Sequence, residues 1–98
     1  LGGNVIHKRL EPSVRKCISD ILTASIRYGL DHRHEAVEYA LPYAREMGHD
    51  LADRFVGMYV NHWTLDYGER GREAIRRFLR RAFEQGLIPH LQGLEFVA

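Results

Sequence analysis

The feature that most constrains this chain is a run of mixed aromatic and polar residues near its middle, from Met58 to Glu69. Aromatic rings that pack together shield their polar neighbours from water, so those neighbours need hydrogen-bond partners inside the protein. We therefore expect a structural corner, at which one helix ends and the next begins. Its apolar staples would be Trp63, Leu65 and Tyr67, and its backbone caps Asn61, Thr64 and Asp66.

Three helices are expected before the corner, because apolar residues recur there every three or four positions. The first begins at Pro12, with Ser13 as a possible cap, and Gly29 is placed to end it in a left-handed conformation. Its expected buried face consists of Val14, Cys17, Ile18, Ile21, Leu22, Ser25 and Tyr28.

The second helix is expected after Asp31, which can cap it. Pro42 lies within this helix and cannot donate a hydrogen bond to the carbonyl of Glu38. Since Glu38 would face solvent, water can satisfy that carbonyl, and we expect a kink at Pro42 and not an end. The apolar stripe of the helix consists of Ala36, Val37, Ala40, Tyr43, Ala44 and Met47.

The third helix, from about Leu51 to Asn61 or His62 with Asp50 as its cap, is apolar almost all round. Such a helix is predicted to lie centrally, between other elements. The fourth helix is predicted to run from about Glu69 to Gln85 and to end at Gly86. Its buried face would consist of Ala74, Ile75, Phe78, Leu79, Ala82 and Phe83.

The two ends of the chain differ from its helical middle. The segment from Asn4 to Leu10 is short, β-branched at its centre and preceded by two glycines, which predicts a strand. A lone strand pairs with a strand of a longer parent, pairs with a second copy, or stays loose. Because the chain also starts at Leu1 and not at a methionine, we expect a fragment. The residues from His90 onward would be a second extended piece or a disordered tail.

Size and charge exclude several classes of protein. A chain of 98 residues makes one domain, and a formal charge of +1 gives no general attraction to nucleic acid or anionic membrane. The single cysteine, Cys17, excludes an internal disulfide and a cysteine-built zinc site. No apolar run approaches the roughly 20 residues that span a bilayer. We therefore expect a soluble cytoplasmic protein without a nucleic-acid or membrane partner.

The fourth helix carries a cluster of arginines on the side away from its apolar stripe. A nucleic-acid surface is one interpretation. Acidic residues on the same side favour an ordinary solvated face laced with ion pairs, such as Glu73 with Arg77 and Glu69 with Arg72. The arginines are Arg70, Arg72, Arg76, Arg77, Arg80 and Arg81.

The six histidines do not predict a metal site. His32 and His34 are two residues apart and would diverge on a helix, whereas helical zinc ligands converge at a spacing of four. His62, beside Trp63, is the one histidine we expect to be buried, in a structural role. Cys17 lies on the expected inward face without a cationic neighbour, which argues against a nucleophile.

The segment Gly2-Gly3-Asn4 allows two interpretations. Paired glycines let a backbone approach the carboxylate or phosphate of a ligand, and Asn4 could add a hydrogen-bond donor. A simple turn or hinge explains the same residues. No helix begins directly after them to complete an anion site, so the second interpretation is favoured.

Four segments of the chain together resemble one enzyme family. They are Leu1 to Ile6, Ser25 to Arg33, Tyr59 to Gly71 and Gly86 to Pro89. They resemble the C-terminal part of the 1,4-dihydroxy-6-naphthoate synthases, a family of the futalosine route to menaquinone that is similar to periplasmic solute-binding proteins. The part from Tyr59 to Gly68 is the most specific.

The resemblance implies a two-lobed α/β parent of the periplasmic-binding-protein type II kind. This chain, mainly α with about four helices and a short N-terminal strand, would be its single C-terminal fragment, residues 1–98. Residues 1–10 would be a crossover strand of the first lobe, residues 12–89 the helical part and residues 90–98 the tail. Its partners would be the remaining lobes of the parent. Alternatively, exposed strand or helix faces could pair two copies.

The family's reaction implies a lyase, without a cofactor, that cleaves cyclic dehypoxanthine futalosine to release 1,4-dihydroxy-6-naphthoate, with a histidine as base. No histidine of this chain matches that histidine, so the resemblance implies no catalytic residue here and a structural role for the fragment. Gly2, Gly3 and Asn4 would line the substrate cleft. The alternative is the C-terminal part of an ABC-transporter-type solute-binding protein, which needs no base.

Overall fold

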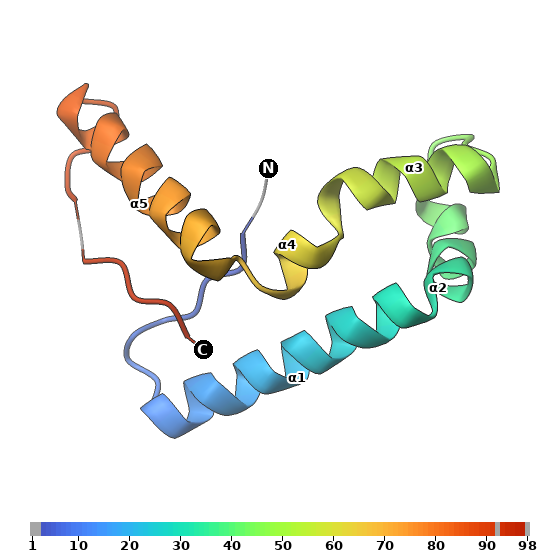
Figure 1. The fold of residues 1–98 in the computed structure, drawn as a ribbon, viewed down its shortest axis with the longest axis horizontal. Helices are drawn as coiled ribbons and strands as arrows, with labels where there is room; N and C mark the ends of the chain where they lie inside the picture. Colours follow the sequence, from blue (N-terminus) through green and yellow to red (C-terminus); the bar gives the residue numbers. More distant parts are fainter. Residues whose placement is uncertain (1–2, 92, 98) are drawn as a thin grey trace.

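The structure is a computed structural model that describes residues 3–91 and 93–97. The fold is mainly helical, as predicted, and no strand forms among these residues. Figure 1 shows the arrangement. The elements in order are α1 (Pro12–Asp31), α2 (Arg33–Ala40), the 3₁₀ turn η1 (Leu41–Tyr43), α3 (His49–Tyr59), the short α4 (His62–Leu65) and α5 (Gly68–Glu84).

The helices form an open arrangement. In Figure 1, α2 and α3 fold back at one end of α1, while α5 leads away beyond α4. The radius of gyration is 16.4 Å, against about 13 Å for a compact domain of 100 residues. Accordingly, Val37 and Ala52 are the only buried apolar side chains in the described part of the chain.

The start of α1 follows the prediction, but its end does not. Pro12 occupies the first turn, whereas the cap position is Glu11 and Ser13 lies inside the helix. Gly29 does not end the helix, because the backbone stays helical there and the carbonyl of Tyr28 accepts the N–H of His32 at 2.9 Å. Asp31 is therefore the last residue of α1 and not the cap of α2.

Pro42 ends the second helix, so the predicted kink is wrong. The carbonyl of Glu38 does not remain free for water, because it accepts the backbone N–H of Leu41. That shorter bond tightens the chain into the 3₁₀ turn η1, after which Ala44 is extended. Tyr43, expected on the buried stripe, is exposed in consequence.

Among the described residues, helix α3 packs against α2 along one side and does not hold the predicted central position. The ion pair between Arg33 and Asp53, at 2.5 Å, joins the two helices. The other sides of α3 are exposed, with Met58 at 72%. The N-cap position is Gly48 and not Asp50.

The corner and the last helix confirm the sequence predictions. Asn61 caps the short helix α4, and Asp66 accepts the N–H of Gly68 at 2.9 Å. Helix α5 ends at Gly86, whose φ of 70° is the left-handed conformation that a glycine cap supplies. The N–H groups of Gly86 and Leu87 then bond the carbonyls of Phe83 and Ala82. The apolar stripe of α5, in contrast, has no buried residue.

The predicted N-terminal strand does not form in the described residues. Residues 3–7 have no regular secondary structure, and a turn follows in which the N–H of Leu10 donates to the carbonyl of His7 at 3.2 Å. The segment nearest to it is the C-terminal segment 93–97, and the two meet through a side chain, with Lys8 donating to the carbonyl of Gly93 at 2.8 Å. A ladder needs backbone groups from both sides, which this contact does not supply.

Candidate functional site

A cavity of about 620 Å³ is the candidate site. It lies where five parts of the chain meet: the N-terminal segment, α1, the α4–α5 corner, α5 and the C-terminal segment. In Figure 1 both terminal segments run through the space between α1 and α5. Its volume falls within the range of about 300–1,000 Å³ that small-molecule sites occupy.

Helix α1 supplies one wall. Arg15, Ser19, Leu22 and Ile26 follow each other at helical spacing and all line the cavity. This face differs from the predicted buried face of α1. The two faces have Ile18 and Leu22 in common. Every member of the predicted face is exposed, namely Val14, Cys17, Ile18, Ile21, Leu22, Ser25 and Tyr28.

The corner supplies the opposite wall. The Thr64 hydroxyl accepts the N–H of Asn61 at 3.1 Å and donates to the carbonyl of Tyr59 at 2.9 Å. Asn61 Oδ1 in turn accepts the N–H of Trp63 at 3.0 Å. These bonds fix the backbone, so that Thr64, Asp66 and Tyr67 face the cavity. A corner built in this way positions side chains rigidly.

Tyr67 approaches α5 closely because of a glycine. A Cβ atom at Gly71 would lie 2.9 Å from the Cβ of Tyr67, closer than side chains tolerate. The Trp63 ring lies 3.9 Å from the same position, so α4 packs on the first turn of α5 there. Tyr67 is thereby held between α5 and the N-terminal segment. A staple from α3 to α5 through Trp63, Leu65 and Tyr67 stays a prediction.

The sequence-predicted ligand residues lie partly at this cavity. Gly3 and Asn4 line it, and Gly2 lies outside the described residues. A Cβ atom at Gly3 would be 3.6 Å from the Tyr67 hydroxyl, an ordinary contact, so the cavity does not require a glycine there. Contact of these residues with a ligand stays a prediction.

The C-terminal segment closes the cavity. The ring of Phe96 lies 5.6 Å and 5.3 Å from the guanidinium carbons of Arg72 and Arg76, and edge-on to Tyr67 at 6.3 Å. Glu95 lies 3.6 Å from Nη1 of Arg15. Residues 93–97 have no regular secondary structure, and the extended piece and the disordered tail both stay predictions.

Charged side chains of both signs line the cavity, namely Lys8, Arg15, Arg72, Asp66 and Glu95, and the sequence did not single out the two arginines for it. The Nε atoms of Arg15 and Arg72 are buried and have no acceptor among the described residues. The sequence predicts no role for Arg15 and places Arg72 among the solvated arginines of α5. The available signal was helical spacing, since Arg72 lies three residues before Ile75, on the apolar stripe.

Ion pairs do form among the charges of α5, as the favoured interpretation expects, but in the described residues they involve Arg72 and Arg76. Arg76 lies 3.0 Å from Glu69 and 3.6 Å from Glu73. The partners differ from the expected pairs, because Arg76 reaches both carboxylates at once. Exposed pairs of this kind contribute about 0–1 kcal/mol each.

The histidines lie apart from the cavity. His34 and His49 are neighbours with ring centroids 4.3 Å apart, and His32 stacks on Tyr28 at 3.9 Å. His62 is exposed, so its predicted burial is wrong: its ring lies 4.9 Å from that of Trp63, which is itself exposed. Across residues 3–91 and 93–97, no group of three or more histidine, cysteine or acidic side chains could hold a metal ion.

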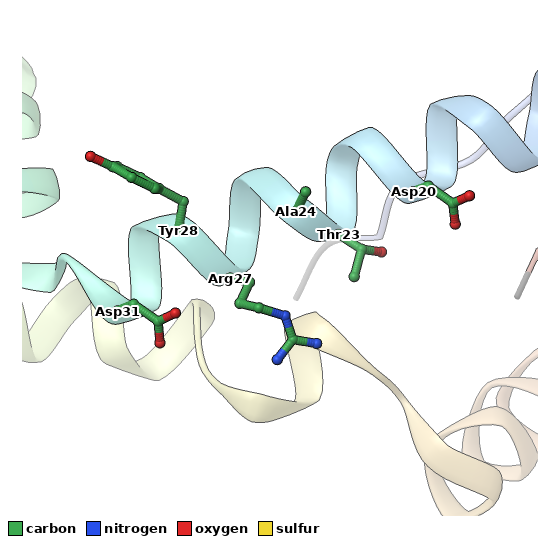
Figure 2. A pocket seen from close by; sticks show the side chains of 6 residues that line it. All are labelled: Asp20, Thr23, Ala24, Arg27, Tyr28 and Asp31. Carbon is green, nitrogen blue, oxygen red and sulfur yellow. The ribbon is translucent and has the colours of Figure 1, made fainter.

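A second hollow, of about 400 Å³, runs along α1 (Figure 2). All of its lining residues belong to this one helix, from Asp20 to Asp31. Figure 2 shows that Tyr28 and Ala24 leave the helix on one side and Arg27 and Asp31 on the other. With no second element opposite, this hollow cannot enclose a ligand, and the cavity between the terminal segments remains the candidate site.

None of the described helices combines the length and apolar character needed to cross a membrane. No solved structure matches the chain. Comparison with characterised proteins is more informative. The chain is 36% identical over 91 residues to a 1,4-dihydroxy-6-naphthoate synthase of Streptomyces coelicolor, covering 93% of this chain and 32% of that protein.

A second relative matches a similar length of this chain. It is a 1,4-dihydroxy-6-naphthoate synthase of Thermus thermophilus, 30% identical over 87 residues, which cover 89% of this chain and 32% of the relative. The chain thus spans about a third of the length of both relatives. The sequence model of a family described as menaquinone biosynthesis matches residues 1–84. The chain therefore belongs to the menaquinone biosynthesis family.

Proposed function

We propose that this chain is the C-terminal part of a lyase that converts cyclic dehypoxanthine futalosine to 1,4-dihydroxy-6-naphthoate for menaquinone synthesis. Its own role is structural: it completes a lobe of the two-lobed parent and contributes no catalytic residue. Support comes from two relatives named for that product and from the third of their length that the chain spans.

The observation that carries the structural role is the exposure of apolar side chains on three helices. Ile21 on α1, Met58 on α3 and Phe78 on α5 are each more than 60% exposed. Large exposed apolar surface is typical of an interface. In the proposal, the remaining part of the parent enzyme packs on this apolar surface and covers the stripe of α5 and the outer sides of α3.

The reaction would take place in the cytoplasm, in which the exposed thiol of Cys17 stays reduced. The base that the reaction needs would come from the rest of the parent. The histidines of this chain lie away from the cavity, and none is paired with a group that would hold it as a base there.

The test compares the full gene product with the 98-residue chain. Each is incubated with cyclic dehypoxanthine futalosine, and release of 1,4-dihydroxy-6-naphthoate is followed by mass spectrometry. The full product should release it and the chain alone should not. Turnover by the chain alone would contradict the structural role, and tight binding without turnover by the full product would favour a solute-binding protein.

A further inference from the structure

Helix α1 carries an exposed apolar stripe that takes no part in the cavity. Val14, Ile21 and Tyr28 are 43%, 64% and 61% exposed, and Cys17 and Ala24 between them are exposed as well. None of these five residues, which we call the outer stripe, lines the cavity. Helix α1 runs along one edge of the molecule (Figure 1). The outer stripe is therefore placed to meet another chain.

The spacing of the outer stripe fits a partner that is itself a helix. Val14, Ile21 and Tyr28 follow each other at intervals of seven residues, and Cys17 and Ala24 each lie three residues after one of them. This repeat is the seam along which two helices pack in a coiled coil, and it is narrower than the apolar face of an ordinary core helix. The 20 residues of α1 contain almost three such repeats.

The charges beside the outer stripe show which helix fits. Lys16, Asp20, Arg27 and Asp31 are exposed along one edge of the stripe, at intervals of four, seven and four residues. Their signs alternate, so two parallel copies of α1 would place like charges opposite each other. Two antiparallel copies would place Lys16 opposite Asp31. They would also place Asp20 opposite Arg27, and each of these pairs would occur twice. Charges at such flanking positions set the orientation of paired helices.

The side chains of the outer stripe fit the same antiparallel arrangement. Tyr28 would face Cys17 of the second copy, and Ile21 would face Ala24 of the second copy. Each layer thus joins a large and a small side chain, which allows close packing. The hollow of about 400 Å³ that Ala24 and Tyr28 line has no wall opposite it in this chain (Figure 2). A second α1 would supply that wall.

We propose that α1 pairs antiparallel with α1 of a second copy through the outer stripe, so that the full gene product is a two-fold symmetric dimer. The proposed function assigns the stripe of α5 and the outer sides of α3 to the rest of the parent enzyme, and it leaves the outer stripe of α1 to this second copy. The inference goes beyond the proposed function, because it concerns assembly and holds whichever reaction the parent enzyme performs.

The first experiment is sedimentation equilibrium of the full gene product over a range of concentrations, which should show a reversible dimer. D20R and R27D should each raise the Kd of the dimer by roughly tenfold, because like charges would then meet twice across the interface. The double variant D20R/R27D restores opposite charges and should return the Kd to near its original value. This variant still lacks the ion pair between Lys16 and Asp20, so greater helix stability cannot explain its recovery.

The control for these charge reversals is R77D, since Arg77 is exposed on α5, away from the outer stripe. It should leave the Kd unchanged. Circular dichroism verifies that each variant is folded.

A second experiment tests the orientation by oxidation with copper phenanthroline. Y28C should give a disulfide-linked dimer on a non-reducing gel, because position 28 faces Cys17 of the second copy. The unmodified protein and C17S/Y28C should not be linked through α1, because identical positions would lie about 16 Å apart along the antiparallel helices. A disulfide needs Cα atoms within about 7 Å of each other.

Several results would overturn the proposal. One is a full gene product that stays monomeric at every concentration. Another is a folded double variant that dimerises no better than D20R or R27D. Cross-linking of the unmodified protein through Cys17 would indicate parallel copies and overturn the orientation. A dimer that does not release 1,4-dihydroxy-6-naphthoate would contradict the proposed function alone, and a monomer that releases it would contradict this inference alone.

Discussion

The backbone N–H of Asn61 donates to the hydroxyl of Thr64, 3.1 Å away, while the same hydroxyl donates to the carbonyl of Tyr59. One oxygen atom thus joins the end of α3 to the first turn of α4. This bridge fixes the direction in which the chain enters α5 and presents Tyr67 to the cavity.

Replacing Thr64 with valine keeps the shape of the side chain and removes both bonds. We expect T64V to lower the free energy of unfolding by about 1–3 kcal/mol, because the N–H of Asn61 and the carbonyl of Tyr59 lose their partner. Urea unfolding of the 98-residue chain, followed by circular dichroism, measures the change. T23V on α1 is the matched control and should change stability by less than about 0.5 kcal/mol. Equal effects of the two substitutions would contradict a special role for the corner.

Replacing two glycines inside helices by alanine should change the free energy of unfolding in opposite directions. A Cβ atom at Gly29 meets nothing within 4 Å, so G29A should raise the free energy of unfolding by about 0.5–1 kcal/mol through helix propensity. A Cβ atom at Gly57 would lie against Nη2 of Arg33 and push that side chain away from Asp53. G57A should therefore destabilise the protein or, at best, leave it unchanged. Thermal melts of both variants decide the sign, and a clear gain for G57A would show that α2 and α3 are not held together by Arg33.

Gly86 ends α5 with a φ of 70°. G86A should cost about 1–2 kcal/mol, because a Cβ atom is strained in that conformation. G86N is the informative companion, since asparagine tolerates the left-handed region and should lose less. Urea unfolding of the two variants measures the difference. A helix that ends normally in G86A without loss of stability would show that the cap bonds of Gly86 and Leu87 do not depend on the glycine.

Substitution of Phe78 tests whether the apolar stripe of α5 is covered in the parent protein. In the 98-residue chain its side chain is 72% exposed, so F78A should change the stability of that chain by less than about 0.5 kcal/mol. In the full gene product the same change should cost about 3–5 kcal/mol if the rest of the enzyme packs on it. The measurement is the melting temperature of both proteins with and without the substitution. R77Q on the wet side of α5 is the control and should be neutral in both. Equal, small losses in chain and full product would contradict the proposed interface.

The features predicted correctly from the sequence are those that neighbouring residues determine. The caps of the corner by Asn61 and Asp66 and the stop at Gly86 depend on side chains and backbone groups within a few positions. The effect of Pro42 was misjudged, although it too is local, because the carbonyl of Glu38 has a choice between water and the N–H of Leu41. Hydrophobic periodicity finds the helix but does not decide between such partners.

Features that depend on distant parts of the chain were mostly missed. The apolar character of α3 predicted a central position, yet which sides become covered depends on elements that α3 meets in space. The cavity combines Arg15, Arg72 and Phe96 from separate parts of the chain, and no spacing in the sequence relates them. Gly3 and Asn4 were selected for their backbone freedom, and the structure places them at the cavity for the different reason that the N-terminal segment passes Tyr67.

The hydrogen bond between Lys8 and Gly93 bears on how this part of the protein can be rearranged, in evolution or by protein engineering. It brings the two terminal segments together, so a chain that enters this unit leaves it beside its point of entry. A unit with adjoining ends can be transplanted into another backbone, or rewired so that its helices follow one another in a new order, through a short linker. Joining residues near Lys8 and Gly93 by such a linker would leave the order of the helices between them unchanged.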